Sequence, residues 1–328
     1  MNRYLYIDKL KTLGLLLIFL AHVSPPMFLF QLRNFDVILM IIVSCILFFL
    51  SRKKLSFGDY ILKRFKRLVI PTWIFLTIFF ILSFLMGVYF NLKVIISSFA
   101  LHGGIGYVWV IKIYLLVAII LPLVKPLLLK KEKILYIISL LSLILNEFFA
   151  FTGYFDNFAY KYIIGYIIPC LFIIIYSYWL TVSSTKKILL ASLFFFIIYT
   201  VAAIFLFQKN GSYIDTNSFK YPFRIYYLSY GLSISSIFFI YFKKIESSFN
   251  SSKFLTQIVN FTSRNSLWLY LIHIQVVIVL NSLFDFNWFL KYILLIIFTY
   301  LITLFKNSII NIIKEKFPNF RQIYFFEG

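Results

Sequence analysis

The sequence predicts an all-α fold, a polytopic transmembrane bundle of about ten helices with both termini in the cytoplasm. Of its 328 residues, 62% are hydrophobic and 13% are charged, whereas a soluble domain has about 45–50% apolar and about 25% charged residues. The apolar runs recur from end to end, and no polar stretch between them is long enough for a globular domain. We therefore expect a single membrane domain over residues 1–328, without an appended soluble domain.

Ten apolar runs are candidates for membrane spans, because crossing the hydrocarbon takes about 20 mostly apolar residues. They cover residues 11–30, 36–51, 68–90, 107–129, 134–150, 161–181, 188–207, 222–242, 265–284 and 289–313. No small-residue cleavage site follows the first run, so we expect a retained span there rather than a removed signal peptide.

The basic residues alternate between the connections of these runs and set the topology. They gather at Arg3 to Lys11, Arg52 to Arg67, Lys125 to Lys133, Lys186 and Lys187, Lys243 to Lys253, and Lys306 to Arg321. Because Lys and Arg near span ends stay in the cytoplasm, both termini are expected inside. The net charge of +21 then reflects topology and attraction to anionic lipid, and we expect no nucleic-acid partner.

The first run carries Asp8, Lys11 and His22, and ionisable groups at membrane depth are functional candidates. Lys11 and His22 are eleven residues apart, close to three helical turns, so they share one face roughly 16 Å apart along the axis. Pro26 lies four residues after His22, and a proline there removes a helical hydrogen bond. We therefore expect a polar cavity near His22, since unpaired carbonyls in lipid need protein or water beside them.

An imidazole ordinarily has a pKa near neutrality, so a histidine at this position can take a hydroxyl proton or accept an acyl group itself. The alternative is a buried histidine that only holds neighbouring helices together. Neither cysteine, Cys45 or Cys170, belongs to a CxxC motif or lies near other metal-ligand residues. We expect no disulfide framework and no metal site.

Four segments together resemble the acyltransferase-3 family. Lys11, ten intervening residues and His22 are similar to its Arg/Lys-x10-His signature, and Asp8 matches the acidic residue before it. Three more segments agree in order and spacing: VSCILF at 43–48 with a Ser-Gly-Phe stretch, KRFKRLVIP at 63–71 with a basic loop ending in Pro, and NSLWLYLIH at 265–273 with a Tyr-Leu-x-His segment. The chain departs from the family at Lys11, which replaces the commoner Arg and lacks its bidentate fork, and at Cys45, where Gly is usual.

The resemblance implies a ten-helix enzyme of a bacterial plasma (inner) membrane. Such an enzyme moves an acyl group, usually acetyl from cytoplasmic acetyl-CoA, to a hydroxyl of an extracytoplasmic or lipid-linked polysaccharide. The expected partners are acyl-CoA, a glycan or lipid-linked saccharide acceptor, membrane lipid and proteins of envelope polysaccharide synthesis. No metal cofactor is expected.

The candidate site residues follow from these motifs. Catalysis is assigned to His22 and His273, CoA binding to Lys11, Asp8, Lys63, Arg64 and Arg67, and a cavity-lining role to Ser44. His273 could orient His22, share a proton with it or be purely structural. The basic cluster at 63–67 could hold CoA phosphates or anchor lipid headgroups. His102, in a glycine-rich outer loop, could touch the acceptor or be a solvated loop histidine, and the nearby Tyr107 is expected to be an aromatic-belt anchor.

Two other classes of function remain open at this point. An exporter of polysaccharide or lipid-linked glycan would also use a membrane bundle with a polar cavity, but it would not need a cationic cluster beneath an intramembrane histidine. A purely structural membrane component would need neither the cationic cluster nor the intramembrane histidine. Stabilisation of the purified protein by CoA separates the enzyme from both, since a ligand that binds only the native state raises its stability.

Overall fold

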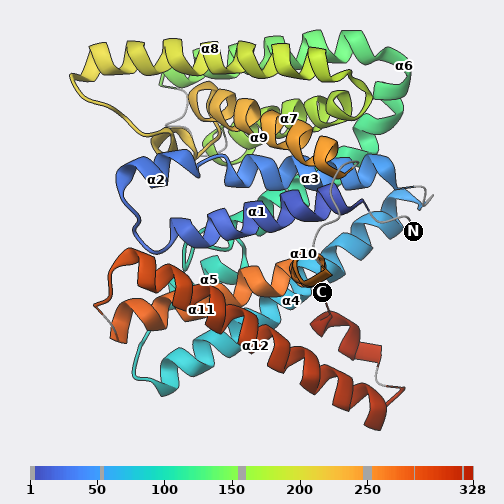
Figure 1. Cartoon of the computed structure of the whole chain (residues 1–328), viewed down its shortest axis with the longest axis vertical. Coiled ribbons are helices and arrows are strands. Elements are labelled where there is room, and N and C mark those ends of the chain that lie inside the picture. Colours follow the sequence, from blue (N-terminus) through green and yellow to red (C-terminus); the bar gives the residue numbers. More distant parts are fainter. Residues whose placement is uncertain are drawn as a thin grey trace. The chain divides into compact units, whose positions relative to one another are not determined.

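A computed structural model describes residues 4–51, 55–153, 160–246, 253–283, 285–319 and 321–327 (Figure 1). Its regular elements are all helical and these residues form no strand, which confirms the all-α prediction. Seven described helices are long and apolar enough to cross a membrane, or eight if the pair α10 and α11 is one bent span. The total of ten spans and the cytoplasmic position of both termini stay predictions.

The chain divides into two compact units, each built from three separated segments. The first unit contains Met1–Leu17, Pro26–Lys53 and Leu116–Ser252, and the second contains Ile18–Pro25, Lys54–Leu115 and Lys253–Gly328. The single membrane domain over residues 1–328 stays a prediction.

The first unit is a layer of packed helices. It contains α2 (Met27–Leu32), α3 (Asp36–Leu50), α7 (Gly165–Val182), α8 (Thr185–Asn210), η3 (Thr216–Phe219) and α9 (Ile225–Glu246). Helix α3 packs on α7 and α9, and α8 packs along α9.

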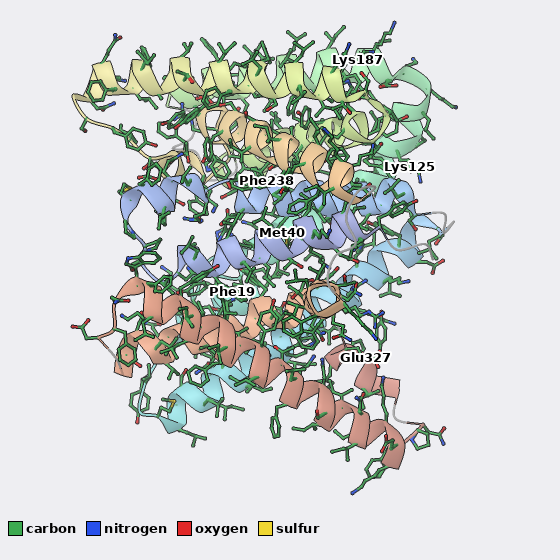
Figure 2. All side chains as sticks on the ribbon, viewed as in Figure 1. Phe19, Met40, Lys125, Lys187, Phe238 and Glu327 are labelled. Carbon is green, nitrogen blue, oxygen red and sulfur yellow. The ribbon has the colours of Figure 1, made fainter. Side chains whose placement is uncertain are left out.

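Close approach and hydrogen bonds join these helices. A Cβ on Gly231 of α9 would lie 2.6 Å from Ile38 of α3, so glycine is required at this crossing. The hydroxyls of Ser192 on α8 and Ser233 on α9 each donate to the other's carbonyl at 2.9 Å. Such interhelical bonds suit a membrane interior, where lipid offers no hydrogen-bond partner. Phe238 of α9, labelled in Figure 2, stacks on the buried ring of Phe35, which directly precedes α3.

The second unit contains α4 (Phe57–Leu85), α5 (Leu92–Phe99), α10 (Lys253–Arg264), α11 (Ser266–Leu283), α12 (Trp288–Lys316) and η4 (Arg321–Phe326). Helix α11 packs on α12 and α4, and η4 packs back on α4 and α12. Helix α10 meets α11 at 83°. Side-chain caps start the long helices: Ser56 accepts from the Asp59 N–H at 3.1 Å, and Asn287 accepts from the Leu290 N–H at 2.9 Å.

Large apolar side chains remain exposed along the helices that are long enough to cross a membrane. On α8 they include Leu190, Leu193 and Phe205, and on α12 they include Leu301 and Phe305. A soluble protein rarely leaves such continuous apolar faces in water. The faces are explained if lipid covers them, as expected of a multi-pass membrane protein.

The helix boundaries correct several predicted spans. Helix α1 (Leu5–Ala21) ends well before residue 30, so the predicted first span 11–30 is wrong at its C-terminal end. Helix α4 begins at Phe57 rather than at 68, because its capped first turns carry the basic residues that lowered the apolar signal. Helix α6 (Trp109–Phe151) covers both 107–129 and 134–150 and is interrupted at Lys131, whose φ of −137° and ψ of 43° are not helical. That interruption falls in the connection predicted between the two spans.

Candidate active site

His22 follows directly on the last residue of α1. Its N–H donates to the Phe19 carbonyl at 3.1 Å, a tight bond that closes the helix. Ser24 then takes a positive φ of 52°, an uncommon conformation for a residue other than glycine, and the helix does not continue past His22. The expectation that Pro26 breaks a helix at the His22 carbonyl is therefore wrong, because the helix ends ahead of both prolines. The half-buried His22 projects from a helix terminus.

His273, on α11, lies beside His22 in the second unit. The ring centroids of the two imidazoles are 5.3 Å apart. His273 is fully buried, with 0% of its surface exposed, and its Nδ1 shares a hydrogen bond with the Tyr270 carbonyl. A carbonyl can only accept, so Nδ1 carries the proton and Nε2 is left as the basic nitrogen. Among the described residues, Nε2 has no hydrogen-bond partner.

Aromatic rings enclose the two imidazoles. Phe19, labelled in Figure 2, stacks on His273 with centroids 4.8 Å apart. Tyr107 meets His22 edge to face at 4.8 Å, and the Tyr270 hydroxyl donates to the Tyr107 carbonyl at 2.6 Å. These aromatic contacts help to hold the two imidazoles in place.

A strained loop carries Tyr107 to this place. Its residue Gly104 has a φ of +60°, and a Cβ there would lie 2.0 Å from the Ser98 hydroxyl. That hydroxyl accepts the Ile105 N–H at 3.0 Å, which ties the loop to α5. Burial raises the pKa of Tyr107, so its hydroxyl stays protonated at neutral pH. Tyr107 thus contacts His22, a position that the prediction of an aromatic-belt anchor did not anticipate, while His102 in the same loop is exposed.

The cluster of Lys63, Arg64 and Arg67 lies on the first turns of α4, not on a loop as expected. Lys63 and Arg67 are exposed and Arg64 is half-buried. The Arg64 Nε donates to the Tyr60 hydroxyl at 3.0 Å. The cluster and the two histidines belong to the same unit, and the exposed cations remain accessible to an anionic ligand.

The other predicted site residues belong to the first unit. Asp8 is buried and its carbonyl accepts the Thr12 hydroxyl at 2.9 Å, while Lys11 and Ser44 are half-buried. It stays a prediction that Lys11 and His22 share one helical face. The same holds for the roles assigned to Asp8, Lys11 and Ser44. Among the described residues, no three His, Cys, Asp or Glu side chains gather as a metal site.

Sequence reasoning missed a buried ion cluster in the first unit, formed by Arg33, Asp36 and Lys220. The Asp36 carboxylate accepts from Arg33 at 2.7 Å and from the Val37 N–H at 2.7 Å, and Lys220 lies 3.5 Å away. Burial lowers the pKa of Lys220 to about 8, against the opposing attraction of Asp36. The only local signal was the i,i+3 spacing of Arg33 and Asp36, because Lys220 is distant in sequence.

The family described as an acyltransferase domain, Acyl_transf_3, matches residues 4–307. The match includes all four segments that carry the resemblance. No curated protein and no solved structure matches the chain. Since the match spans nearly the whole chain, which carries helices apolar enough to cross a membrane, the chain belongs to the acyltransferase-3 family and is a multi-pass membrane acyltransferase.

Proposed function

We propose that the chain moves an acetyl group from cytoplasmic acetyl-CoA to a hydroxyl of an extracytoplasmic or lipid-linked polysaccharide, with His22 as the reacting imidazole. The observation that carries the proposal is the pairing of His22 with His273, 5.3 Å apart inside a shell of aromatic rings. Proton transfer by a positioned imidazole is the usual means of activating a hydroxyl near neutral pH.

The transfer can follow two routes that give the same products. As a base, His22 takes the proton of the acceptor hydroxyl while the hydroxyl oxygen attacks the thioester carbonyl. The C–S bond then breaks, and the CoA thiolate takes that proton from the imidazolium. As a carrier, a nitrogen of His22 attacks the thioester carbonyl, the C–S bond breaks, and the thiolate takes the ring N–H proton to leave as CoA. The acceptor oxygen then attacks the acyl-imidazole, the N–C bond breaks, and the hydroxyl proton returns to the ring. Both routes end in an ester and free CoA.

His273 is a positioning residue in this proposal. Its Nδ1 is engaged by the Tyr270 carbonyl, so its basic Nε2 is directed into the same enclosure as His22. A nitrogen lone pair there can fix the tautomer of the His22 ring or share the proton that His22 collects. Neither role requires His273 to touch the substrates.

The donor enters from the cytoplasmic side in this proposal. Lys63, Arg64 and Arg67 of the second unit are the proposed contacts to the CoA phosphates. Lys11 and Asp8 keep the CoA-binding role, and Ser44 the cavity-lining role, that the family resemblance implies. Charge-assisted hydrogen bonds to Lys and Arg are the expected way to hold CoA phosphates. The protein would lie in a bacterial plasma membrane, beside the proteins that synthesise the envelope polysaccharide.

Replacing His22 tests the proposal directly. We expect His22→Ala to lower ester formation on the envelope glycan by about 10²- to 10⁴-fold, the usual contribution of a general base. Gln208→Ala is the control, since it removes an exposed polar side chain of α8 to which no role in the reaction is assigned. Both variants are compared at equal amounts of folded protein in the membrane. Normal acetylation by His22→Ala would rule out the assignment.

An exporter of polysaccharide or lipid-linked glycan makes a different prediction. Native-state binding of CoA at a concentration 100 times its dissociation constant stabilises a protein by about 2.7 kcal/mol. The enzyme should therefore gain thermal stability from CoA. Lack of any gain, combined with glycan that accumulates inside cells lacking the protein, would favour export.

A further inference from the structure

The short helix η4 folds back over a group of cations in the second unit. Its Phe326 carbonyl accepts a hydrogen bond from the Lys306 Nζ at 2.8 Å. Glu327, labelled in Figure 2, forms an ion pair with Lys314 of α12. One short segment thus supplies partners to two lysines of α12.

An aromatic platform lies within the same group. The Phe326 ring is parallel to the Trp268 ring, with an interplanar angle of 7° and centroids 6.1 Å apart. Lys306 Nζ lies 4.7 Å from the Trp268 ring centroid, a cation–π contact. The Trp268 indole N–H is buried and has no hydrogen-bond partner in the described part of the chain. An unpaired buried donor beside a cation is where an anionic or acceptor-bearing ligand gains most.

The segment therefore presents a flat ring, a carbonyl oxygen and a carboxylate to an aromatic side chain and two lysines. The nucleotide end of CoA offers similar groups, since it contains an adenine ring, a 3′-phosphate and a diphosphate. Lys306 and Lys314 are eight residues apart on α12, about 12 Å along the axis, so they can engage different phosphate groups.

The position of Trp268 on α11 also fits a donor subsite. Trp268 precedes His273 by five residues, about 7.5 Å along the helix. Trp268 lies toward the helix end that follows the basic Arg264, and His273 lies deeper in the apolar part. A nucleotide at Trp268 would leave its thioester arm free to extend toward the two imidazoles.

We propose that Trp268, Lys306 and Lys314 bind the nucleotide end of the acyl-CoA donor, and that residues 323–327 occupy this subsite until the donor displaces them. This inference rests on the proposed use of acyl-CoA and adds to it the residues of the subsite and a segment that competes for it. The measured free energy of donor binding is then the free energy gained by binding the nucleotide less the free energy needed to release the segment.

Binding measurements on the full-length purified protein test the subsite without requiring turnover. The probes are CoA and adenosine 3′,5′-bisphosphate, which has the adenine and two phosphates but no thioester arm. We expect Lys306→Gln to weaken both by about tenfold, the effect of losing one hydrogen bond to a charged group. Lys187→Gln, which removes an exposed charge on α8, should leave both affinities within about twofold.

Changes in the segment should act in the opposite direction. Phe326→Ala and Glu327→Gln each remove a contact that competes with the donor, so we expect both to bind CoA about threefold to tenfold more tightly. Glu327→Gln alters only a partly exposed ion pair, so it reports on competition even if Phe326→Ala folds poorly.

Two results would overturn the inference in distinguishable ways. If the wild type binds CoA but the Lys306 and Glu327 variants bind it equally well, the subsite is wrong and the proposed donor stands. If neither the wild type nor Glu327→Gln binds CoA, both the subsite and the CoA donor are wrong.

Discussion

The Asp36 carboxylate of the first unit and the His273 imidazole of the second are both buried, but their polar atoms are satisfied to different degrees. Asp36 has two cations and a backbone N–H within reach of its oxygens. His273 has one nitrogen bonded to a carbonyl, while its Nε2 has no partner among the described residues. Removing the Asp36 carboxylate would leave two buried cations without a compensating charge.

His273 keeps a nitrogen lone pair that can still accept a hydrogen bond. An unpaired nitrogen on a buried ring costs stability, and it is retained here beside another imidazole. The comparison teaches that burial alone does not mark a functional residue. We expect changes at Asp36 to affect mainly stability, and changes at His273 to affect mainly acyl transfer.

The largest effect is expected from Asp36→Asn. The change leaves Arg33 and Lys220 buried without their carboxylate, and breaking a buried ion pair typically costs about 3–5 kcal/mol. The apparent melting temperature in detergent should fall markedly, while acyl transfer per folded molecule stays near that of the wild type. Adding Lys220→Met should restore part of the stability. A variant that melts normally but has lost activity would reverse the roles assigned to the two clusters.

His273→Gln should show the opposite pattern. The glutamine amide can still donate to the Tyr270 carbonyl, but it cannot take up a proton. We expect acyl transfer to fall by about 10- to 100-fold, below the full effect of losing a general base, because His273 acts through His22. The melting temperature should be kept and the pH profile of the rate should flatten. A lower melting temperature with an unchanged pH profile would show that His273 is structural.

How much of the fold the sequence predicts depends on the kind of helix. Long apolar runs such as α3, α7 and α9 were located from hydropathy alone, because lipid or a core must cover them. The amphipathic α10 and the short α5 were not predicted, since their polar residues hide them from an apolar window. The start of α4 was missed for the same reason, and the end of α1 was placed beyond two prolines that in fact follow it.

The site shows a similar division. His22 and His273 could be selected from sequence because ionisable residues stand out within apolar runs. Tyr107 and Phe19 could not, because in a chain with 24 Tyr and 42 Phe an aromatic residue carries no signal. Their contacts with the imidazoles depend on where a glycine-rich loop and a helix end lie in space. The Asp36 cluster was missed because Lys220 reaches it only through the tertiary fold.

A smaller effect is expected from Tyr270→Phe. This change removes the 2.6 Å hydrogen bond to the Tyr107 carbonyl, a loss of about 1 kcal/mol. The loop should hold Tyr107 less firmly against His22, and acyl transfer should fall by roughly fivefold. Tyr300→Phe is the matched control, because its hydroxyl bonds Thr262 in the same unit, outside the histidine enclosure. Equal losses in both variants would indicate a general packing effect.

The smallest effect is a pH dependence of stability that arises from Lys220. Its pKa in the folded protein is lowered to about 8 by burial, from an ordinary value of 10.5. Between these values the unfolded chain binds more protons than the native state, so the free energy of unfolding rises with pH. Below pH 8 the cluster carries two cations against one carboxylate, and above it Arg33 and Asp36 remain as a neutral pair.

Thermal melts between pH 7.5 and 10 measure this slope, and Lys220→Met isolates it. Other groups titrate in the same range, but they do so in both proteins, so only the difference in slope belongs to Lys220. We expect the wild type to gain stability relative to the variant as the pH rises. Parallel curves would show that the native state keeps Lys220 charged, and that Asp36 offsets the cost of its burial more fully than the lowered pKa indicates.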